Sequence, residues 1–170
     1  MKKIYFNIFL ILVAAQSFAQ GEIYRTLRFG VGLGPAYSDI YGTTGLIITF
    51  EPAINCNDIL FAGIRFESGG VEWSDSLDDY VFGFTSLALS VQYYFSVEKF
   101  RPFIGGGLGS YHVNEDHKTG GIYFRGGFDF GHLSLSADYN MILPSEGSST
   151  PFLTYVGGRI GFFIGGGRKK

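Results

Sequence analysis

The stretch HLSLSADYNMIL, from His132 to Leu143, alternates between two kinds of side chain. Apolar residues occupy every second position from Leu133 to Leu143, and the positions between them are mostly polar. A period of two residues is typical of a β-strand with two unlike faces. The fold of the whole chain depends on which face of this strand meets water.

The first residues, MKKIYFNIFLILVAAQSFAQGE, have the order of a secretory signal peptide. Two lysines precede an apolar run, and small residues follow it. A retained transmembrane helix is the alternative, but Ile4–Ala15 is shorter than the roughly 20 apolar residues that a span needs. We therefore predict that residues 1–19 are a signal peptide for Sec export, cleaved after Ala19, and that residues 20–170 form one domain.

The composition of the chain argues against several classes of protein and kinds of site. Without Lys2 and Lys3 the chain has 11 basic and 15 acidic residues, a formal net charge of −4, which does not indicate a nucleic-acid surface. Cys56 is the only cysteine, which excludes an internal disulfide and a cysteine-based zinc site. No later apolar stretch has the length of a transmembrane helix, so insertion into a membrane would depend on strands.

Eight extended segments follow the signal, separated alternately by short turns and longer polar connections. The short turns are ND (Asn57–Asp58), VEK (Val97–Lys99) and GH (Gly131–His132), and the longer connections are DIYGTT, SGGVEWSDSLDD, NEDHKT and PSEGSST. An up-and-down barrel would gather the short turns at one rim, as outer-membrane barrels do. The predicted segments are Thr26–Ser38, Gly45–Cys56, Leu60–Glu67, Tyr80–Ser96, Phe100–Val113, Gly121–Phe130, His132–Leu143 and Pro151–Ile164.

One face of these segments is apolar and the other carries charge. A two-residue turn at Gly131–His132 pairs Phe130 with Leu133, so the apolar register continues across that hairpin. The predicted apolar face includes Leu27, Phe29, Val31, Leu33, Leu46, Ile48, Phe50, Ile54, Leu60, Ile64, Phe66, Val156, Ile160, Phe162 and Ile164. The opposite face holds Arg28, Glu51, Arg65, Glu67, Arg125, Asp129, Asp138 and Arg159.

A soluble barrel would place the apolar face inside, but two features favour the inverse. The apolar face is too bulky for the interior of a small barrel, and the charged face carries glycines suited to a crowded interior, as in RFGVGLG and GGRIG. A closed barrel also satisfies every backbone polar group in a bilayer. We predict an all-β, eight-stranded antiparallel up-and-down transmembrane β-barrel.

Some details of this barrel follow from segment length and composition. The third segment is short for a span of roughly 9–11 residues, and the fourth is long enough to project beyond the outer rim. The fifth, FRPFIGGGLGSYHV, has too many glycines for a face assignment. Aromatic residues near strand ends suit interfacial girdles, namely Tyr37, Tyr41, Trp73, Tyr80, Phe95, Phe100, Phe130 and Phe152.

The pattern resembles the small eight-stranded outer-membrane barrels of the OmpA/OmpX type, and is more closely similar to the PorT-like "outer membrane protein beta-barrel domain" proteins of Bacteroidota. The sharpest likeness is YVGGRIGFFIG, in which Tyr155, Gly157, Ile160 and Phe162 fit the family's C-terminal assembly signal for the barrel-insertion machinery. The chain departs from that pattern by continuing with GGGRKK. The resemblance implies the outer membrane of a Gram-negative cell envelope, with roles that include adhesion and accessory functions in secretion.

The charged face admits two interpretations. An eight-stranded barrel has an interior only wide enough for side chains to fill, and buried charges need partners. A gated ion path is one interpretation, and a structural plug of ion pairs is the other. We expect the plug, which the resemblance to OmpA also implies, and therefore little or no conductance.

Catalytic and metal-binding alternatives rest on short motifs. His132 and Ser134 resemble the His-x-Ser motif of outer-membrane lipid A deacylases. Such a site needs a nucleophile, a base and an acid within reach of one another, but these two residues are predicted at a short turn and the acidic Glu146 in a loop at the opposite rim. EDHK, Glu115–Lys118, offers His117 beside two acids, and His117 and His112 could together contact a metal, but we favour a solvated loop. The GGGLGS run lacks the ending of a phosphate-binding loop and a following helix. We expect no enzyme activity, cofactor or metal.

The longest internal connection is the remaining candidate for binding. Ser68–Asp79 carries Glu72, Asp75, Asp78 and Asp79 around Trp73, which suits a basic partner surface or, through divalent ions, lipopolysaccharide phosphates. We expect a non-enzymatic barrel that contacts outer-membrane lipids and lipopolysaccharide and uses its loops for surface interaction or envelope integrity. An accessory subunit of a secretion complex and a lipid A-modifying enzyme are the alternatives.

Overall fold

The computed structural model describes residues 26–38, 43–75, 78–113, 117–144 and 153–166, with the side chains of 43, 71–75, 78–82, 113 and 117 left out. The predicted signal peptide and the predicted aromatic residues Tyr41 and Phe152 therefore lie outside the described residues. The strands are β1 (Leu27–Ser38), β2 (Thr43–Asn57), β3 (Leu60–Asp75), β4 (Asp78–Tyr94), β5 (Phe100–Val113), β6 (His117–Phe130), β7 (Leu133–Ile142) and β8 (Leu153–Gly165).

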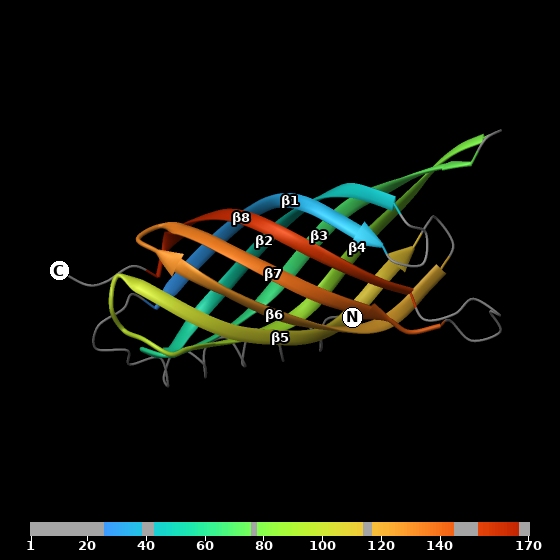
Figure 1. The fold of residues 1–170 in the computed structure, drawn as a ribbon. Coiled ribbons are helices and arrows are strands. Elements are labelled where there is room, and N and C mark those ends of the chain that lie inside the picture. Colours follow the sequence, from blue (N-terminus) through green and yellow to red (C-terminus); the bar gives the residue numbers. More distant parts are fainter. Residues whose placement is uncertain (1–25, 39–42, 76–77, 114–116, 145–152, 167–170) are drawn as a thin grey trace, which may run out of the picture.

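The eight strands form one closed antiparallel barrel in which each strand pairs with its neighbours in sequence (Figure 1). β1 pairs with β8, from Arg28 opposite Gly165 to Tyr37 opposite Val156, and this pairing closes the sheet. The predicted fold class is confirmed. Among the described residues, no helix has the length and apolar character required to cross a membrane.

The two ends of the barrel differ. One end, here called the turn rim, holds the connections at residues 58–59, 95–99 and 131–132 together with the start of β1 and the end of β8. At the other end, the loop rim, β1, β3, β5 and β7 end and β2, β4, β6 and β8 begin. The predicted distribution of the turns between the two rims is therefore confirmed.

The first short turn lies one residue later than predicted. β2 continues through Asn57, and Oδ1 of Asn57 accepts hydrogen bonds from the backbone N–H of Ile59 (3.0 Å) and Leu60 (2.9 Å). An Asn side chain that bonds the backbone two or three residues ahead replaces the turn's own hydrogen bonds. An irregularity in the β2–β3 register between Asn55 and Asn57 absorbs the extra residue.

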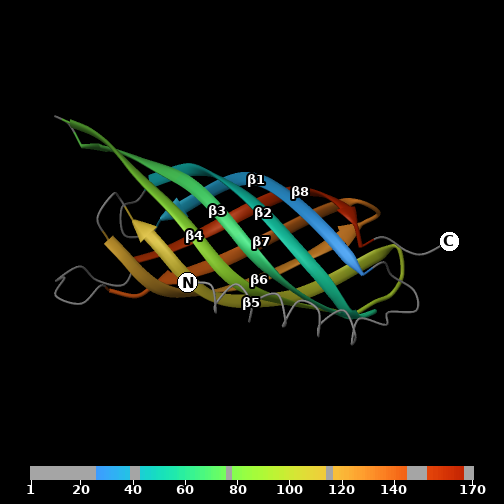
Figure 2. The ribbon, with the colours of Figure 1, turned by 180° about the vertical axis from the view of Figure 1, so that it is seen from behind.

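The predicted loop Ser68–Asp79 is wrong, because most of it belongs to strands. β3 and β4 remain paired from Leu60–Tyr93 to Asp75–Asp78. β2 pairs with β3 only as far as Val71, and β5 pairs with β4 only as far as Phe84. Residues 72–75 and 78–81, here called the β3–β4 ribbon, therefore pair only with each other, and they project well beyond the other strands at the loop rim (Figure 2).

The outer wall of the barrel is apolar, as predicted. The side chains of Leu89, Ile160 and Ile164 are 63, 68 and 67% exposed. The other residues of the predicted apolar face are exposed too, except Ile54, Leu60 and Ile64, which are half-buried and alternate with inward residues. Tyr37, Phe95, Phe100 and Phe130 are exposed near strand ends, as the girdle prediction requires. Such an apolar wall favours contact with lipid acyl chains rather than with water.

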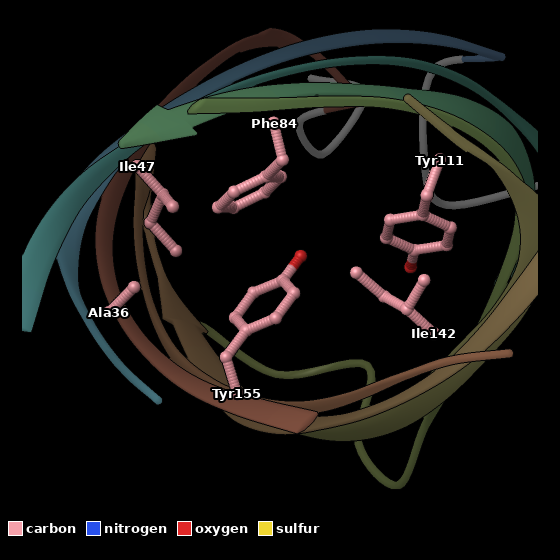
Figure 3. Close-up of a cluster of buried hydrophobic side chains, with 6 residues drawn as sticks. All are labelled: Ala36, Ile47, Phe84, Tyr111, Ile142 and Tyr155. Atoms are coloured by element: carbon pink, nitrogen blue, oxygen red, sulfur yellow. The ribbon is translucent and has the colours of Figure 1, made fainter. Parts of the chain in front are cut away.

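The lumen is less polar than predicted. Apolar side chains, most of them bulky, fill its loop-rim half: Ala36, Ile47, Phe84, Tyr111, Ile142 and Tyr155 point inward and pack together (Figure 3). A second cluster, Phe61, Tyr94 and Phe103, lies near the turn rim. The expectation that bulky apolar residues occupy only the outer face is therefore wrong, because inward glycines leave room for rings: a Cβ on Gly69 would lie 2.8 Å from Cζ of Phe84, and a Cβ on Gly121 would lie 2.6 Å from Cε2 of Tyr111.

Candidate functional site

The centre of the lumen holds an ion-pair network assembled from three strands. Arg65 and Glu67 come from β3, Asp138 from β7 and Arg159 from β8. Nη2 of Arg65 lies 3.1 Å from Oδ2 of Asp138 and also binds Glu67. Arg159 bridges the same two carboxylates, binding Asp138 through Nη1 and Glu67 through Nη2. All four side chains are buried, so each charge depends on the others for its stabilisation.

Neutral groups complete this central network. Nδ2 of Asn140 donates to Oδ2 of Asp138 at 2.8 Å, and the hydroxyl of Tyr155 donates to Glu67. Tyr111 in turn donates to Oδ1 of Asn140 at 3.3 Å. The apolar cluster of the loop-rim half is thus joined to the charged layer through the hydroxyls of its two tyrosines.

A second pair lies on the turn-rim side of the centre. Nη1 of Arg125 lies 2.5 Å from Oε2 of Glu51, while Nε of Arg125 lies 3.9 Å from Oδ1 of Asp138. Oε1 of Glu51 accepts hydrogen bonds from Ser90 (2.7 Å) and Gln92 (3.0 Å), so both oxygens of this carboxylate are engaged.

The third pair lies nearest the turn rim. Nη1 of Arg28 lies 2.7 Å from Oδ2 of Asp129, and the hydroxyl of Tyr94 donates to the same oxygen at 2.7 Å. The guanidinium carbon of Arg28 lies 3.8 Å from the ring centroid of Phe163, within the range of a cation–π interaction. The structure thus brings all eight sequence-predicted lumen residues inward, each with a partner among the others.

Arg101 is a lumen residue that the sequence pattern did not assign. It is buried at the turn rim, where its guanidinium carbon lies 3.9 Å from the ring centroid of Tyr94. Nη2 donates to the carbonyl of Asp58 (3.0 Å) and Nε to that of Ser96 (3.4 Å), so Arg101 joins two of the short turns. The sequence did contain a sign of this position. Ile104 and Leu108 are apolar and both even-numbered, so they share the outward face of β5, and the odd-numbered Arg101 then lies on the inward face.

The inward glycines of β5 make room for rings on other strands. A Cβ placed on Gly107 would lie 2.6 Å from Cε1 of Tyr123, closer than real Cβ atoms approach a neighbour. The Tyr123 ring in turn lies 4.2 Å from the guanidinium carbon of Arg65. The GGGLGS run therefore lies in a strand and is needed for packing.

The residues of the deacylase-like motif lie at the turn rim. His132 is exposed, and its Nδ1 lies 3.0 Å from the carbonyl oxygen of Phe163. Ser134 is half-buried and stands opposite Asp129 and Gly161 in the ladders. Glu146, Glu115 and Asp116 lie outside the described residues, as does the side chain of His117. Among the residues that are described, no three His, Cys, Asp or Glu side chains are grouped closely enough to hold a metal.

The residues of the predicted binding loop and of the predicted assembly signal lie in strands. The backbones of Glu72, Trp73 and Asp75 belong to β3, and those of Asp78 and Asp79 to β4, although their side chains lie outside the described set. In the predicted assembly signal, Tyr155 and Gly157 are buried on the lumen side of β8, whereas Ile160 and Phe162 point outward. The role of both sets stays a prediction.

Known structures with the same arrangement are outer-membrane barrels. Neisserial surface protein A (NspA) is 15% identical to this chain, with a TM-score of 0.61 over 82% of this chain and 95% of that one. The outer membrane enzyme PagL is 12% identical (TM-score 0.55, covering 81% and 99%), and OprG from Pseudomonas aeruginosa is 13% identical (TM-score 0.52, covering 86% and 99%). At these identities the likeness shows the fold alone. No family model and no curated protein matches the sequence.

Proposed function

We propose that this chain is an integral outer-membrane protein whose barrel is a closed, non-enzymatic anchor that presents the β3–β4 ribbon at the cell surface. The observation that carries this proposal is the filled lumen, in which a layer of ion pairs lies between two clusters of rings. A lumen filled in this way leaves little room for transport, so function falls to what the barrel displays.

The outer wall supports the membrane assignment. Its exposed Leu, Ile, Val and Phe residues continue around the barrel, and a bilayer accepts such a wall only when the sheet is closed. The short turns and both described ends of the chain then face the periplasm, and the ribbon faces outward, as in other barrels of this architecture.

The ribbon supports the assignment of binding to the loop rim. Its two strands have no other pairing partners among the described residues, so their backbone groups are available along both edges. Its sequence contains Glu72, Asp75, Asp78 and Asp79, and Trp73 stands opposite Tyr80 in the register. Acidic groups around an aromatic pair suit a basic protein surface, or lipopolysaccharide phosphates bridged by divalent ions.

An enzymatic role has less support. His132 lies at the turn rim, where an acyl chain on outer-leaflet lipid A would be out of reach, and Ser134 faces the lumen. A comparison of lipid A acyl-chain masses with and without expression of the protein tests this alternative directly.

The decisive experiment is cross-linking in intact outer membranes followed by a pull-down. In the test variant, Asn-Gly replaces residues 72–81; because Val71 pairs with Phe82, this two-residue turn closes the hairpin without disturbing the barrel. The matched control keeps the ribbon and changes only charge, with Glu72→Gln, Asp75→Asn, Asp78→Asn and Asp79→Asn.

We expect a cross-linked partner with the wild type that is lost in the truncated variant. Loss in the charge variant as well would indicate a basic partner, and retention there would assign recognition to the backbone edges and the aromatic pair. Recovery of secretion components would favour the accessory-subunit role. Equal partner recovery from the wild type and the truncated variant would contradict the proposal, as would a chain that is water-soluble without detergent.

A further inference from the structure

A cavity of about 40 Å³ lies inside the barrel beside the ion pairs. Its lining includes the small residues Gly30, Gly32, Ser134, Ser136 and Gly161 together with longer polar side chains. One buried water needs roughly 10–15 Å³ of such space, so the cavity has room for roughly three waters or for one small ion with water.

The lining has more positively than negatively charged groups. Three guanidinium groups line the cavity, those of Arg28, Arg125 and Arg159, with a single carboxylate, that of Glu51. The carboxylates that pair with Arg28 and Arg159 are not among the lining residues. The Nε atoms of Arg125 and Arg159 are buried and have no hydrogen-bond acceptor, which is costly for a charged donor.

The one carboxylate in the lining is already engaged. Oε1 of Glu51 accepts from Ser90 and Gln92, and Oε2 accepts from Arg125. The hydroxyls of Ser134 and Ser136 can rotate to donate into the cavity. A water molecule placed there would accept one or two of these bonds and donate to neutral acceptors such as the serine hydroxyls, since each carboxylate oxygen of the lining is already engaged. An anion, in contrast, can accept hydrogen bonds from donors on all sides.

We propose that this cavity binds one small monovalent anion, with chloride as the reference ligand, held by Arg125, Arg159 and the serines of β7. The anion would offset the excess of guanidinium over carboxylate groups in the lining. The proposal does not depend on the partner of the β3–β4 ribbon, since no residue of the ribbon lines the cavity.

Gly30 offers a way to fill the cavity without removing a charge. A Cβ at this position would first meet the carbonyl oxygen of Glu51 at 3.6 Å and its Cβ at 4.0 Å, which are ordinary contacts. Gly30→Val therefore fits the backbone and places its methyl groups in the cavity space. Gly126→Val is the matched control, because a Cβ on that exposed glycine has no neighbour within 4 Å.

The first measurement is the thermal unfolding midpoint of the folded barrel in detergent, at constant sodium concentration and ionic strength, as chloride replaces gluconate. Gluconate is too large for the cavity. A ligand that binds only the folded state raises the midpoint as its concentration rises. We expect a saturable rise with chloride for the wild type and Gly126→Val, and loss of that rise for Gly30→Val.

The second measurement is direct and does not require a variant. Crystals of the wild type grown in bromide should show an anomalous peak in the cavity beside Arg125 and Arg159. Equal midpoints in chloride and gluconate for the wild type would overturn the proposal. So would a chloride-dependent rise that persists in Gly30→Val, or bromide crystals without a peak, and the crystals decide the matter if Gly30→Val does not fold.

Discussion

Arg65 on β3 and Asp138 on β7 meet in the centre of the lumen although their strands stand on opposite walls of the barrel: Nη2 of the arginine lies 3.1 Å from Oδ2 of the aspartate. Arg159 on β8 binds the same aspartate, and Glu67 on β3 binds both arginines. The contacts from β3 to β7 and from β3 to β8 join strands that share no backbone hydrogen bonds. The ion pairs therefore brace the barrel across its diameter.

This bracing predicts a large cost for removing one carboxylate. Asp138→Asn takes a negative charge from Arg65 and Arg159, both buried, and leaves them with Glu67 alone. Breaking a buried pair by removing one partner costs about 3–5 kcal/mol, because an uncompensated charge stays buried. We expect a loss of that size in the free energy of unfolding, measured by urea titration of the barrel in lipid vesicles.

Glu98→Gln is the control for Asp138→Asn. It makes the same carboxylate-to-amide change on an exposed side chain in the turn between β4 and β5. Exposed ion pairs contribute about 0–1 kcal/mol, so the control should unfold near the wild-type urea concentration. If the two variants lost the same free energy of unfolding, the central network would stabilise the barrel no more than an exposed carboxylate does.

The inside-out orientation of the barrel could be predicted from sequence because it depends only on a period of two. Eight charged residues share one face, and a closed sheet in lipid must turn that face inward. The identity of each partner could not be predicted. Arg125 stands opposite Asp138 in the β6–β7 register, yet its closest carboxylate is Glu51 on β2, across the lumen. Pairing across a lumen depends on side-chain length and rotamer, which the alternation does not report.

The apolar clusters of the lumen could not be predicted from the sequence for a different reason. Ile47 lies in the run GLIITF, where neighbouring positions are apolar on both faces, so the pattern there carries no contrast. Counting by two from Glu51 would have placed Thr49 and Ile47 inside. The ribbon was missed because SGGVEWSDSLDD is rich in polar residues and glycine, although Val71, Trp73, Tyr80 and Phe82 are spaced symmetrically about its turn.

The loop-rim cluster predicts a difference between inward and outward aromatic residues. The ring of Phe84 packs against that of Tyr155, with centroids 4.8 Å apart. Phe84→Ala would leave a cavity that the barrel cannot collapse, at a cost of about 3–5 kcal/mol. Phe124→Ala on the outer wall should cost less, because acyl chains fill the space that the ring vacates. Urea unfolding in vesicles measures both, and equal losses would contradict the packing of this cluster.

The filled lumen also predicts the electrical behaviour of the protein. Ions would have to pass the aromatic cluster of Phe61, Tyr94 and Phe103, the ion pairs and the loop-rim cluster in turn. We expect little or no steady conductance from the purified wild type in planar bilayers. A matched recording of Phe84→Ala should remain closed as well, since the charged layer is intact in that variant. Large, stable single-channel steps from the wild type would overturn this prediction.

The apolar wall predicts that the cost of a charge depends on its depth. Leu89 lies on the outer face of β4, between Ile64 and Leu108 and well inside both rims, whereas Leu133 is the first residue of β7 at the turn rim. Arginine on the lipid face costs about 2–4 kcal/mol at the bilayer midplane and about 0–1 kcal/mol near the interface. We therefore expect Leu89→Arg to lower the free energy of unfolding in vesicles by about 2–4 kcal/mol, and Leu133→Arg to lower it by about 1 kcal/mol or less. In detergent micelles, which deform around a charge, the difference between the two variants should shrink. Equal costs at the two depths in vesicles would mean that the wall does not span a bilayer.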